Sequence, residues 1–178
     1  MTEWRPGERR ADSASMLRVD QAGEYGATRI YAGQLAVLRA NCAEAKLISR
    51  MAAQEQRHLK RFDRLVAERG VRPTALQPLW NVAGFALGAA TALMSPEAAL
   101  ACTDAVETEI DRHYGGQLQQ LGEDDPELAA DIAEFRAEEV EHRDTAREAG
   151  AARAFAYPLL TTAIRAGCKL AIGLSKRI

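Results

Sequence analysis

Two of the three histidines in this 178-residue chain occur in the same short motif, Glu-x-x-His. Glu55 precedes His58 and Glu139 precedes His142, and this spacing puts both side chains of a pair on one face of a helix. A carboxylate and an imidazole placed in this way can ligate one metal ion. Glu55 and His58 also fall on the apolar face of an amphipathic stretch, where their burial is unfavourable unless something compensates it. Bound metal is the compensation that the pattern predicts.

Two further glutamates occupy matching places in an internal near-repeat. Leucine, glutamate, tyrosine and leucine follow one another at intervals of seven residues around Glu24, and again around Glu107. In a four-helix bundle, one inward glutamate from each of two helices and one Glu-x-x-His from each of the others form a di-metal carboxylate site. The predicted ligands are Glu24, Glu55, His58, Glu107, Glu139 and His142. Four carboxylates and two imidazoles suit iron or manganese better than copper(I) or structural zinc.

Other polar residues are candidates for contacts behind these ligands. A metal-bound imidazole usually donates its second N–H to a carboxylate. Asp20, one turn before Glu24, is the first candidate for this role. The weaker candidates and the possible site contacts are Asp104, Asp111, His113, Tyr31 and Tyr114. Glu138 and Glu141 flank Glu139 but lack its spacing to His142, so neither is predicted to be a ligand.

The composition indicates that these positions lie on helices. Alanine, leucine, glutamate and arginine dominate, whereas β-branched and aromatic residues are sparse, as is typical of an all-helical protein. Periodicity predicts four long helices. The first covers residues 15–41, the second follows it almost directly and ends near residue 70, and the third and fourth cover residues 95–121 and 125–149. Ser13 or Ser15, Ser95 and Asp125 are their expected N-caps. The expected architecture is therefore an all-α four-helix bundle.

Two segments outside the long helices are strongly apolar. Residues 79–94 carry no charge, and residues 154–175 are interrupted by Pro158, Arg165 and Lys169. The first would be about 24 Å long as a helix, which is shorter than the bilayer core of about 30 Å. We therefore expect both segments to lie on a bilayer surface, with Arg165 and Lys169 attracting anionic headgroups; the alternative is that they only cover the core. The expected surface residues are Trp80, Phe85, Leu87, Leu93, Phe155, Leu159, Leu160 and Ile164.

The remaining composition limits the function further. One domain is expected over residues 15–178, after a flexible tail at residues 1–14. The net charge of −2, without a clustered basic face, argues against a nucleic-acid partner. The three cysteines are odd in number, show no metal-binding spacing and suit a reducing compartment.

The chain resembles the demethoxyubiquinone hydroxylase family of ubiquinone biosynthesis. Six stretches carry the resemblance: LRVDQAGEYGATRIYAGQLAVL, QEQRHLKRF, PLWNVAGFALGAATALM, ACTDAVETEIDRHY, FRAEEVEHRDTA and AGCKLAIGLSKRI. Glu-x-x-His pairs alone are shared with ferritins, reductases and many oxygenases, whereas DQAGE and the two apolar segments separate this family from them. The resemblance extends over residues 16–178 and fills all six ligand positions.

This resemblance implies a ferritin-like bundle with two additional membrane-associating helices and two Fe2+ ions per chain. It also implies a di-iron monooxygenase that uses O2 to hydroxylate the ring of a polyprenylated methoxy-methyl-benzoquinol, with reducing equivalents from NADH. The implied location is peripheral, on the cytoplasmic face of a bacterial inner membrane or on the matrix side of the mitochondrial inner membrane. A lipid-presenting or biosynthetic-complex partner protein is compatible with this setting.

Two functions of other classes stay open on the residues alone. A ferroxidase or iron-storage protein would use the same bundle, but the uncharged segment at residues 79–94 suits cage assembly poorly. A metal-free membrane-docking bundle would explain the apolar segments. It would leave six buried polar groups without a role.

Overall fold

The computed structural model describes residues 11–177, and every regular element in that range is helical. The elements are α1 (Ser13–Val37), α2 (Ala43–Glu68), α3 (Gln77–Met94), α4 (Pro96–Leu121), α5 (Pro126–Glu148), the short 3-10 helix η1 (Ala151–Arg153) and α6 (Tyr157–Ser175). The all-α prediction is confirmed. The first ten residues of the expected tail lie outside the described range, and the helix that follows begins two residues earlier than expected.

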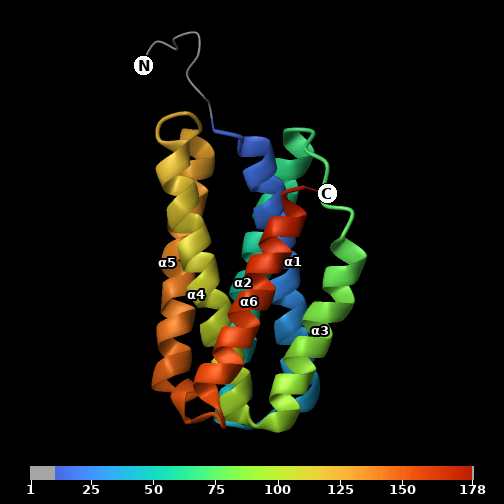
Figure 1. Ribbon diagram of the computed structural model, residues 1–178, viewed down its shortest axis with the longest axis vertical. Helices are drawn as coiled ribbons and strands as arrows, with labels where there is room; N and C mark the ends of the chain where they lie inside the picture. The colour runs from blue at the N-terminus through green and yellow to red at the C-terminus, as the bar shows by residue number, and fades with distance from the viewer. Residues whose placement is uncertain (1–10, 178) are drawn as a thin grey trace.

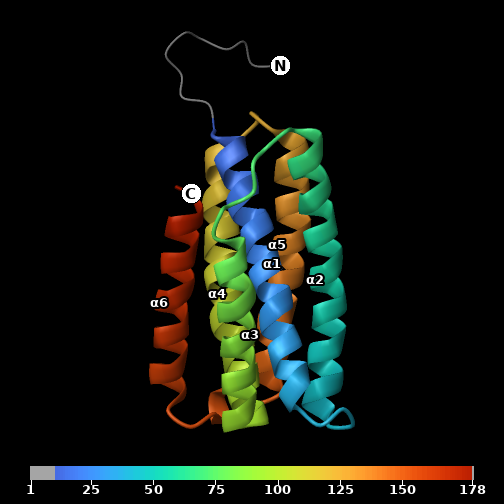
Figure 2. The same cartoon turned by 90° about the vertical axis from the view of Figure 1, so that its right-hand side faces the viewer.

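Consecutive helices run antiparallel along the long axis of the molecule (Figure 1). The bundle consists of α1, α2, α4 and α5, and α3 lies in the long crossover from α2 to α4 (Figures 1 and 2). One such crossover is the connection found in ferritin-like bundles. Two glutamate helices, α1 and α4, and two Glu-x-x-His helices, α2 and α5, are thereby brought around one interior.

Capping side chains begin the bundle helices at defined residues. The Ser95 hydroxyl accepts from the backbone N–H of Ala98 at 3.0 Å, and Oδ1 of Asp125 accepts from that of Leu128 at 3.2 Å. A proline follows each of these caps, where its missing N–H is not needed. The cap of α1 is Asp12 rather than a serine, since its Oδ1 accepts from the Ser15 N–H at 3.0 Å. The two later caps are therefore as predicted, and the first is not.

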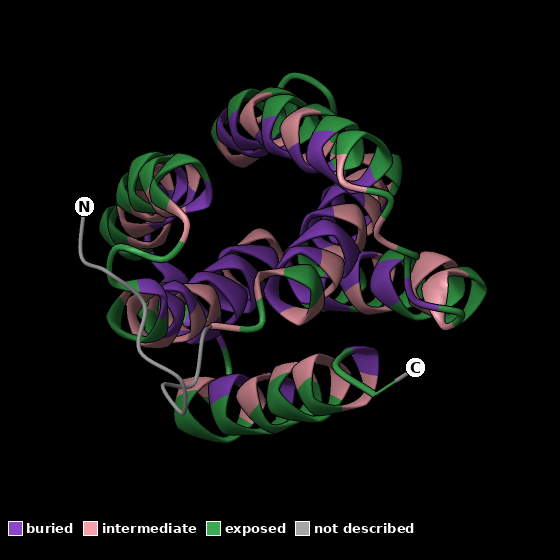
Figure 3. Cartoon of the chain, turned by 90° about the horizontal axis from the view of Figure 1, so that it is seen from above, coloured by how far each residue is buried: buried purple, intermediate pink, exposed green. Residues whose placement is uncertain are grey.

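Two apolar clusters fill the two ends of the bundle. On α2, Ile48 and Met51 belong to one cluster, and Phe62 and Leu65 belong to the other. The polar stretch around Glu55 lies between them. Figure 3 shows that buried residues face the interior of the bundle and exposed residues face outward. The polar layer is therefore sealed by hydrophobic packing on both sides, which holds its side chains away from water.

The crossover helix α3 packs directly on the backbone of α1. A Cβ atom added to Gly88 would lie 1.9 Å from the carbonyl oxygen of Ile30, and one added to Gly33 would lie 2.1 Å from that of Phe85. These distances leave room only for hydrogen, so glycine is required on both sides of the contact. The helix α6 packs on α4 and buries Ile164 against Cys102.

The structure corrects part of the expected apolar surface. Phe85, Leu93, Phe155 and Leu159 are exposed, as expected. Ile164 is buried because it faces α4, while Trp80, Leu87 and Leu160 are half-buried. The helix α6 also begins at Tyr157, later than expected, after η1 and a left-handed turn at Ala156. Within residues 11–177, no helix combines the length and the apolarity that are needed to cross a bilayer.

Arg165 does not present a free charge to a membrane. Its Nε donates to Oε1 of the buried Glu109 at 2.6 Å, and Nζ of Lys169 lies 3.9 Å from Oε2 of the same carboxylate. The pair between Arg165 and Glu109 therefore links α6 to α4, whereas the Lys169 side chain is 59% exposed and adds little to it. This pairing was not predicted, because it depends on how α6 packs against α4.

Candidate metal centre

The four bundle helices place all six predicted ligands in one buried cluster. Each of these side chains belongs to a residue that is at most 3% exposed. Their ligand atoms form two groups, within each of which all atoms lie within 4.8 Å of one another. The first group is Glu24, Glu55, His58 and Glu139, and the second is Glu55, Glu107, Glu139 and His142. Glu55 and Glu139 belong to both groups, so the arrangement has the form of two positions that share two carboxylates.

Both imidazoles turn the same ring nitrogen toward this cluster. Nδ1 of His58 lies 3.0 Å from Oε1 of Glu139 and 3.5 Å from Oε2 of Glu24. Nδ1 of His142 lies 3.1 Å from Oε1 of Glu55 and 3.2 Å from Oε2 of Glu139. In each ring, Nδ1 is therefore the atom that is placed to bind an ion.

The two tyrosines of the near-repeat contact the glutamates in a crossed pattern. The Tyr31 hydroxyl on α1 donates to Oε1 of Glu107 on α4 at 2.9 Å. The Tyr114 hydroxyl on α4 donates to Oε1 of Glu24 on α1. Each tyrosine thus orients the glutamate of the opposite repeat and leaves its second oxygen directed at the cluster. Both tyrosines therefore contact predicted ligands, and their part in the site stays a prediction.

Several buried carboxylate oxygens have no hydrogen-bond donor within residues 11–177. They include Oε2 of Glu24 and Oε2 of Glu107. Neither oxygen of Glu55 accepts a well-formed hydrogen bond, although Oε1 lies 3.1 Å from His142. Buried charges without partners are strongly unfavourable, and a bound cation removes this penalty. The donor set therefore fits metal ions.

The charges of the cluster shift the pKa values of its own members strongly. Burial, followed by the charge of Glu139, raises the pKa of Glu55 and that of Glu107 well above the usual range. Burial opposes the ionisation of Glu139 too, but hydrogen bonds with His142 and His58 lower its pKa to about 2. Burial disfavours charged imidazoles, yet hydrogen bonds to carboxylates raise the pKa of His58 to about 10 and that of His142 to about 9. Without metal, the cluster retains protons.

Residues 11–175 match the family model described as Ubiquinone biosynthesis protein COQ7. The chain belongs to the COQ7 family. This agrees with the family that the sequence motifs predicted.

Named members of the COQ7 family match nearly the whole chain. A 3-demethoxyubiquinol 3-hydroxylase of Rhodospirillum rubrum is 57% identical over 162 residues, which cover 91% of this chain and 76% of the relative. The mitochondrial NADPH-dependent 3-demethoxyubiquinone 3-hydroxylase of Mus musculus is 53% identical over 172 residues, or 94% of this chain and 79% of the relative. The mitochondrial 5-demethoxyubiquinone hydroxylase of Saccharomyces cerevisiae is 42% identical over 179 residues, which cover 92% of this chain and 77% of the relative.

The partners behind the imidazoles in this COQ7 family chain are not the predicted ones. Nε2 of His58 lies 2.8 Å from Oε2 of Glu138, and Nε2 of His142 lies 2.9 Å from Oε1 of Gln54. Each partner directly precedes the glutamate of the opposite Glu-x-x-His pair. In both motifs a polar residue stands directly before the glutamate, Gln54 before Glu55 and Glu138 before Glu139. This shared position could have indicated the two partners from the sequence.

The three aspartates that were candidates for this role lie elsewhere. Asp20 accepts from Gln117 at 2.8 Å and lies 3.1 Å from Nε2 of His113. Asp104 accepts from Arg147 at 2.7 Å and from the Tyr157 hydroxyl. The partners of Asp111 are Arg136 and Arg143. The predictions for these aspartates are wrong: Asp20 faces α4, which carries neither ligand imidazole, and Asp104 and Asp111 pair with arginines of α5 rather than with His142.

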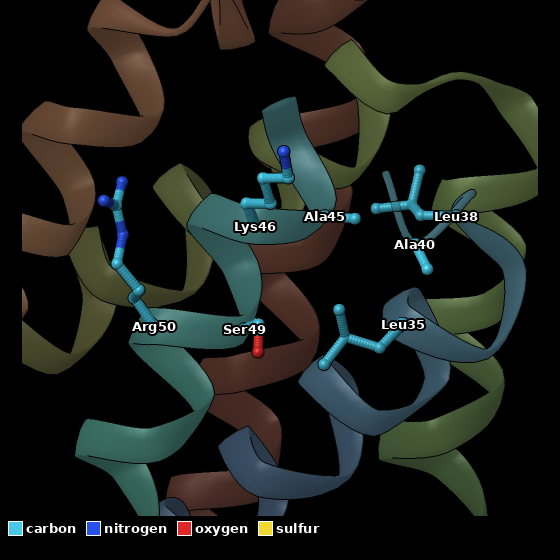
Figure 4. A pocket seen from close by; sticks show the side chains of 7 residues that line it. All are labelled: Leu35, Leu38, Ala40, Ala45, Lys46, Ser49 and Arg50. Atoms are coloured by element: carbon cyan, nitrogen blue, oxygen red, sulfur yellow. The ribbon is translucent and has the colours of Figure 1, made fainter. Parts of the chain in front are cut away.

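Two spaces in the structure differ in their relation to the cluster. A surface hollow of about 490 Å³ lies at the turn between α1 and α2, with leucines on one side and Lys46 and Arg50 on the other (Figure 4). None of the predicted ligands lines it. A second, narrow gap between α1 and α4 is too tight to admit water in this structure. Its lining residues are Ala27, Ile30, Tyr31, Thr103, Val106 and Glu107. Only the second space reaches the cluster.

Proposed function

We propose that this chain is a 3-demethoxyubiquinol 3-hydroxylase of ubiquinone biosynthesis. One observation carries the proposal: two ligand groups that share Glu55 and Glu139 lie buried in a chain of the COQ7 family. Four carboxylates and two imidazoles suit iron. The relatives that match nearly the whole chain are named as hydroxylases of this substrate.

The six cluster residues would hold two Fe2+ ions. Glu24 and His58 belong to one ligand group, Glu107 and His142 belong to the other, and Glu55 and Glu139 belong to both. When bound, such a pair of ions would supply the reducing power for O2 chemistry at a ring C–H of the quinol. The chain itself orients the ligands through Tyr31 and Tyr114 and excludes water by its two apolar clusters. Exclusion of water prevents loss of the activated oxygen to side reactions.

The substrate would reach the cluster through the gap between α1 and α4. Ile30 and Val106 line this gap and also belong to the apolar cluster that Leu87 of α3 and Leu160 of α6 cover. The exposed apolar residues of α3 and α6 would rest on the membrane, from which a polyprenylated quinol must be taken. A small movement of these two helices would open the path. These residues would hold the protein against one surface of the bilayer.

Reducing equivalents would come from a reduced nicotinamide cofactor. The sequence resemblance predicts NADH, whereas the mouse relative is named NADPH-dependent. Full reduction of O2 takes four electrons. The C–H bond of the substrate supplies two of them, and either cofactor can deliver the other two. Comparing turnover with NADH and NADPH at equal concentrations decides between them.

The direct test measures iron and oxygen insertion together. Protein purified without oxygen should contain about two irons per chain. With O2, a reduced nicotinamide cofactor and a short-tailed demethoxyubiquinol, it should form a product that carries one atom of 18O from 18O2. Iron oxidation over many turnovers without hydroxylated product would support the ferroxidase alternative, and protein that binds no metal would support the docking alternative.

A further inference from the structure

The inner contacts of the two proposed metal positions match, but their outer contacts differ. Each position has three carboxylates and one imidazole, and a tyrosine orients one glutamate of each. Behind the rings, however, His58 meets the carboxylate of Glu138, whereas His142 meets the amide oxygen of Gln54. The internal near-symmetry of the chain is therefore broken at this pair of residues.

Metal binding at Nδ1 would fix the direction of both outer hydrogen bonds. When Nδ1 of an imidazole binds a metal, its Nε2 carries the proton and donates it outward. Oε2 of Glu138 and Oε1 of Gln54 are then the acceptors, at 2.8 Å and 2.9 Å. Glu138 also accepts from Arg57 at 2.6 Å. The Arg57 side chain is 52% exposed, so water screens its charge and Glu138 keeps its anionic character toward His58.

A charged acceptor acts on the metal through the ring. A hydrogen bond to an ionised group is about twice as strong as one between neutral groups. It draws the Nε2 proton outward and makes Nδ1 a better electron donor, which strengthens the metal–ligand bond. Phe135 stacks on His58 at 4.1 Å between ring centroids and holds this ring in place. The amide of Gln54 exerts a weaker pull on His142.

We propose that Glu138 and Gln54 make the two metal positions unequal, so that the position at His58 binds its ion more tightly than the position at His142. Both residues are positioning residues, since each acts through a histidine. The inference rests on the proposed di-metal centre. It goes further by assigning an order of filling to two positions whose inner ligands are equivalent.

Metal binding to the full-length apoprotein tests this order without any turnover. Co2+ is added without oxygen, and calorimetry and the visible absorption of the bound ion follow its binding. Two separate steps are expected for the unaltered chain. His58→Ala should remove the tighter step and His142→Ala the weaker one. The opposite assignment would overturn the proposal.

Exchanging the two outer residues gives the sharpest comparison. Glu138→Gln should weaken the tighter step about 10- to 100-fold, which is the usual effect of losing an outer partner, and should bring the two steps together. Gln54→Glu should tighten the weaker step by a similar factor, and a gain in affinity cannot arise from misfolding. The variant that combines Glu138→Gln with Gln54→Glu should again bind Co2+ in two steps. The tighter step should now be the one at the position of His142.

Glu134→Gln is the matched control. Glu134 lies one turn before Glu138 and 3.7 Å from the same Arg57, but it does not contact His58. Both steps should stay unchanged in this variant. If Glu138→Gln and Gln54→Glu also leave both steps unchanged, the inference fails while the di-metal centre stands. If the unaltered chain binds no Co2+ at all, the proposed function fails with it.

Discussion

The hydroxyl of Tyr31 on α1 donates a hydrogen bond to Oε1 of Glu107 on α4, at 2.9 Å. The hydroxyl of Tyr114 on α4 likewise donates to Oε1 of Glu24 on α1. On each helix the tyrosine stands seven residues after the glutamate. From that position it supports the glutamate of the other helix and not that of its own. Removing a single hydroxyl is the smallest change that tests this support.

Tyr31→Phe should lower the free energy of unfolding by about 1–3 kcal/mol, because Oε1 of Glu107 is left buried without its donor. It should also weaken the binding of one of two metal ions. Urea unfolding and metal titration measure the two effects. Tyr25→Phe, on the same helix but half-buried and outside the cluster, should change neither. Equal effects from both variants would assign the loss to packing rather than to the hydrogen bond.

Glu139→Ala should abolish hydroxylation and remove most of the iron, while the helical circular dichroism stays largely intact. Glu139 belongs to both ligand groups, so both ions should be lost. Glu107→Ala removes a member of one group only and should leave close to half of the iron. Glu141→Ala is the control, since this residue is exposed two positions further along the same helix. A loss of iron in the Glu141 variant would show that the register of α5 is wrong.

The stability of the metal-free protein should fall as the pH rises from about 6.5 to 10. The pKa of His58 is raised to about 10 and that of His142 to about 9, above the unfolded value of about 6.5. Groups whose pKa is raised in the native state stabilise it fully below the unfolded pKa and lose this effect as the pH passes the folded pKa. Thermal melting of the apoprotein at pH 6, 7.5 and 9 measures the slope.

Metal should reverse this trend. An ion must displace the protons that the cluster retains, so its affinity rises with pH over the same range. The increase in melting temperature on adding Fe2+ or Mn2+ should therefore be larger at pH 9 than at pH 6. Proton release, measured by calorimetry in buffers of different ionisation enthalpy, should accompany binding. A melting temperature that ignores metal at every pH would contradict a buried metal centre.

Replacing Leu93 and Phe155 together by serine should reduce co-sedimentation with liposomes at least about tenfold, since burying one large apolar side chain contributes about 1.5–3 kcal/mol. These side chains are 74% and 87% exposed, near the ends of α3 and α6 that lie at the same end of the molecule in Figures 1 and 2. Turnover of a long-tailed quinol should fall with it, but that of a short-tailed one should not. Ala163→Ser, also exposed on α6, is the control. Unchanged liposome binding would place the membrane contact elsewhere.

Gly88→Ala should destabilise the protein by about 1–3 kcal/mol, the usual effect of overpacking, because the new methyl group would meet the Ile30 carbonyl at 1.9 Å. Gly116→Ala provides the opposite case. Beyond the neighbouring backbone of α4 itself, no atom lies within 4 Å of a methyl group at Gly116, and alanine favours the helix by up to about 1 kcal/mol. Chemical unfolding of both variants should give changes of opposite sign. A neutral Gly88→Ala would mean that α3 does not pack tightly on α1.

Much of the architecture was predictable because it depends on local spacing. Helical periodicity and the caps at Ser95 and Asp125 place the ends of the later helices within a few residues. The Glu-x-x-His spacing separates Glu139 from Glu138, since only Glu139 stands three residues before His142. The heptads around Glu24 and Glu107 direct both glutamates inward. Each of these features depends on neighbouring turns of a single helix.

Other features depend on how the helices are rotated and offset against one another, which spacing within one helix cannot reveal. Sequence spacing favoured Asp20 behind an imidazole, but the packing of α2 on α5 puts Glu138 and Gln54 there. The same reason explains why Ile164 faces α4 rather than a membrane. The sequence by itself determined which side chains enter the interior, because that choice follows from helical periodicity. Only the tertiary structure decided which of them touch across helices, because those contacts depend on the distances between different backbones.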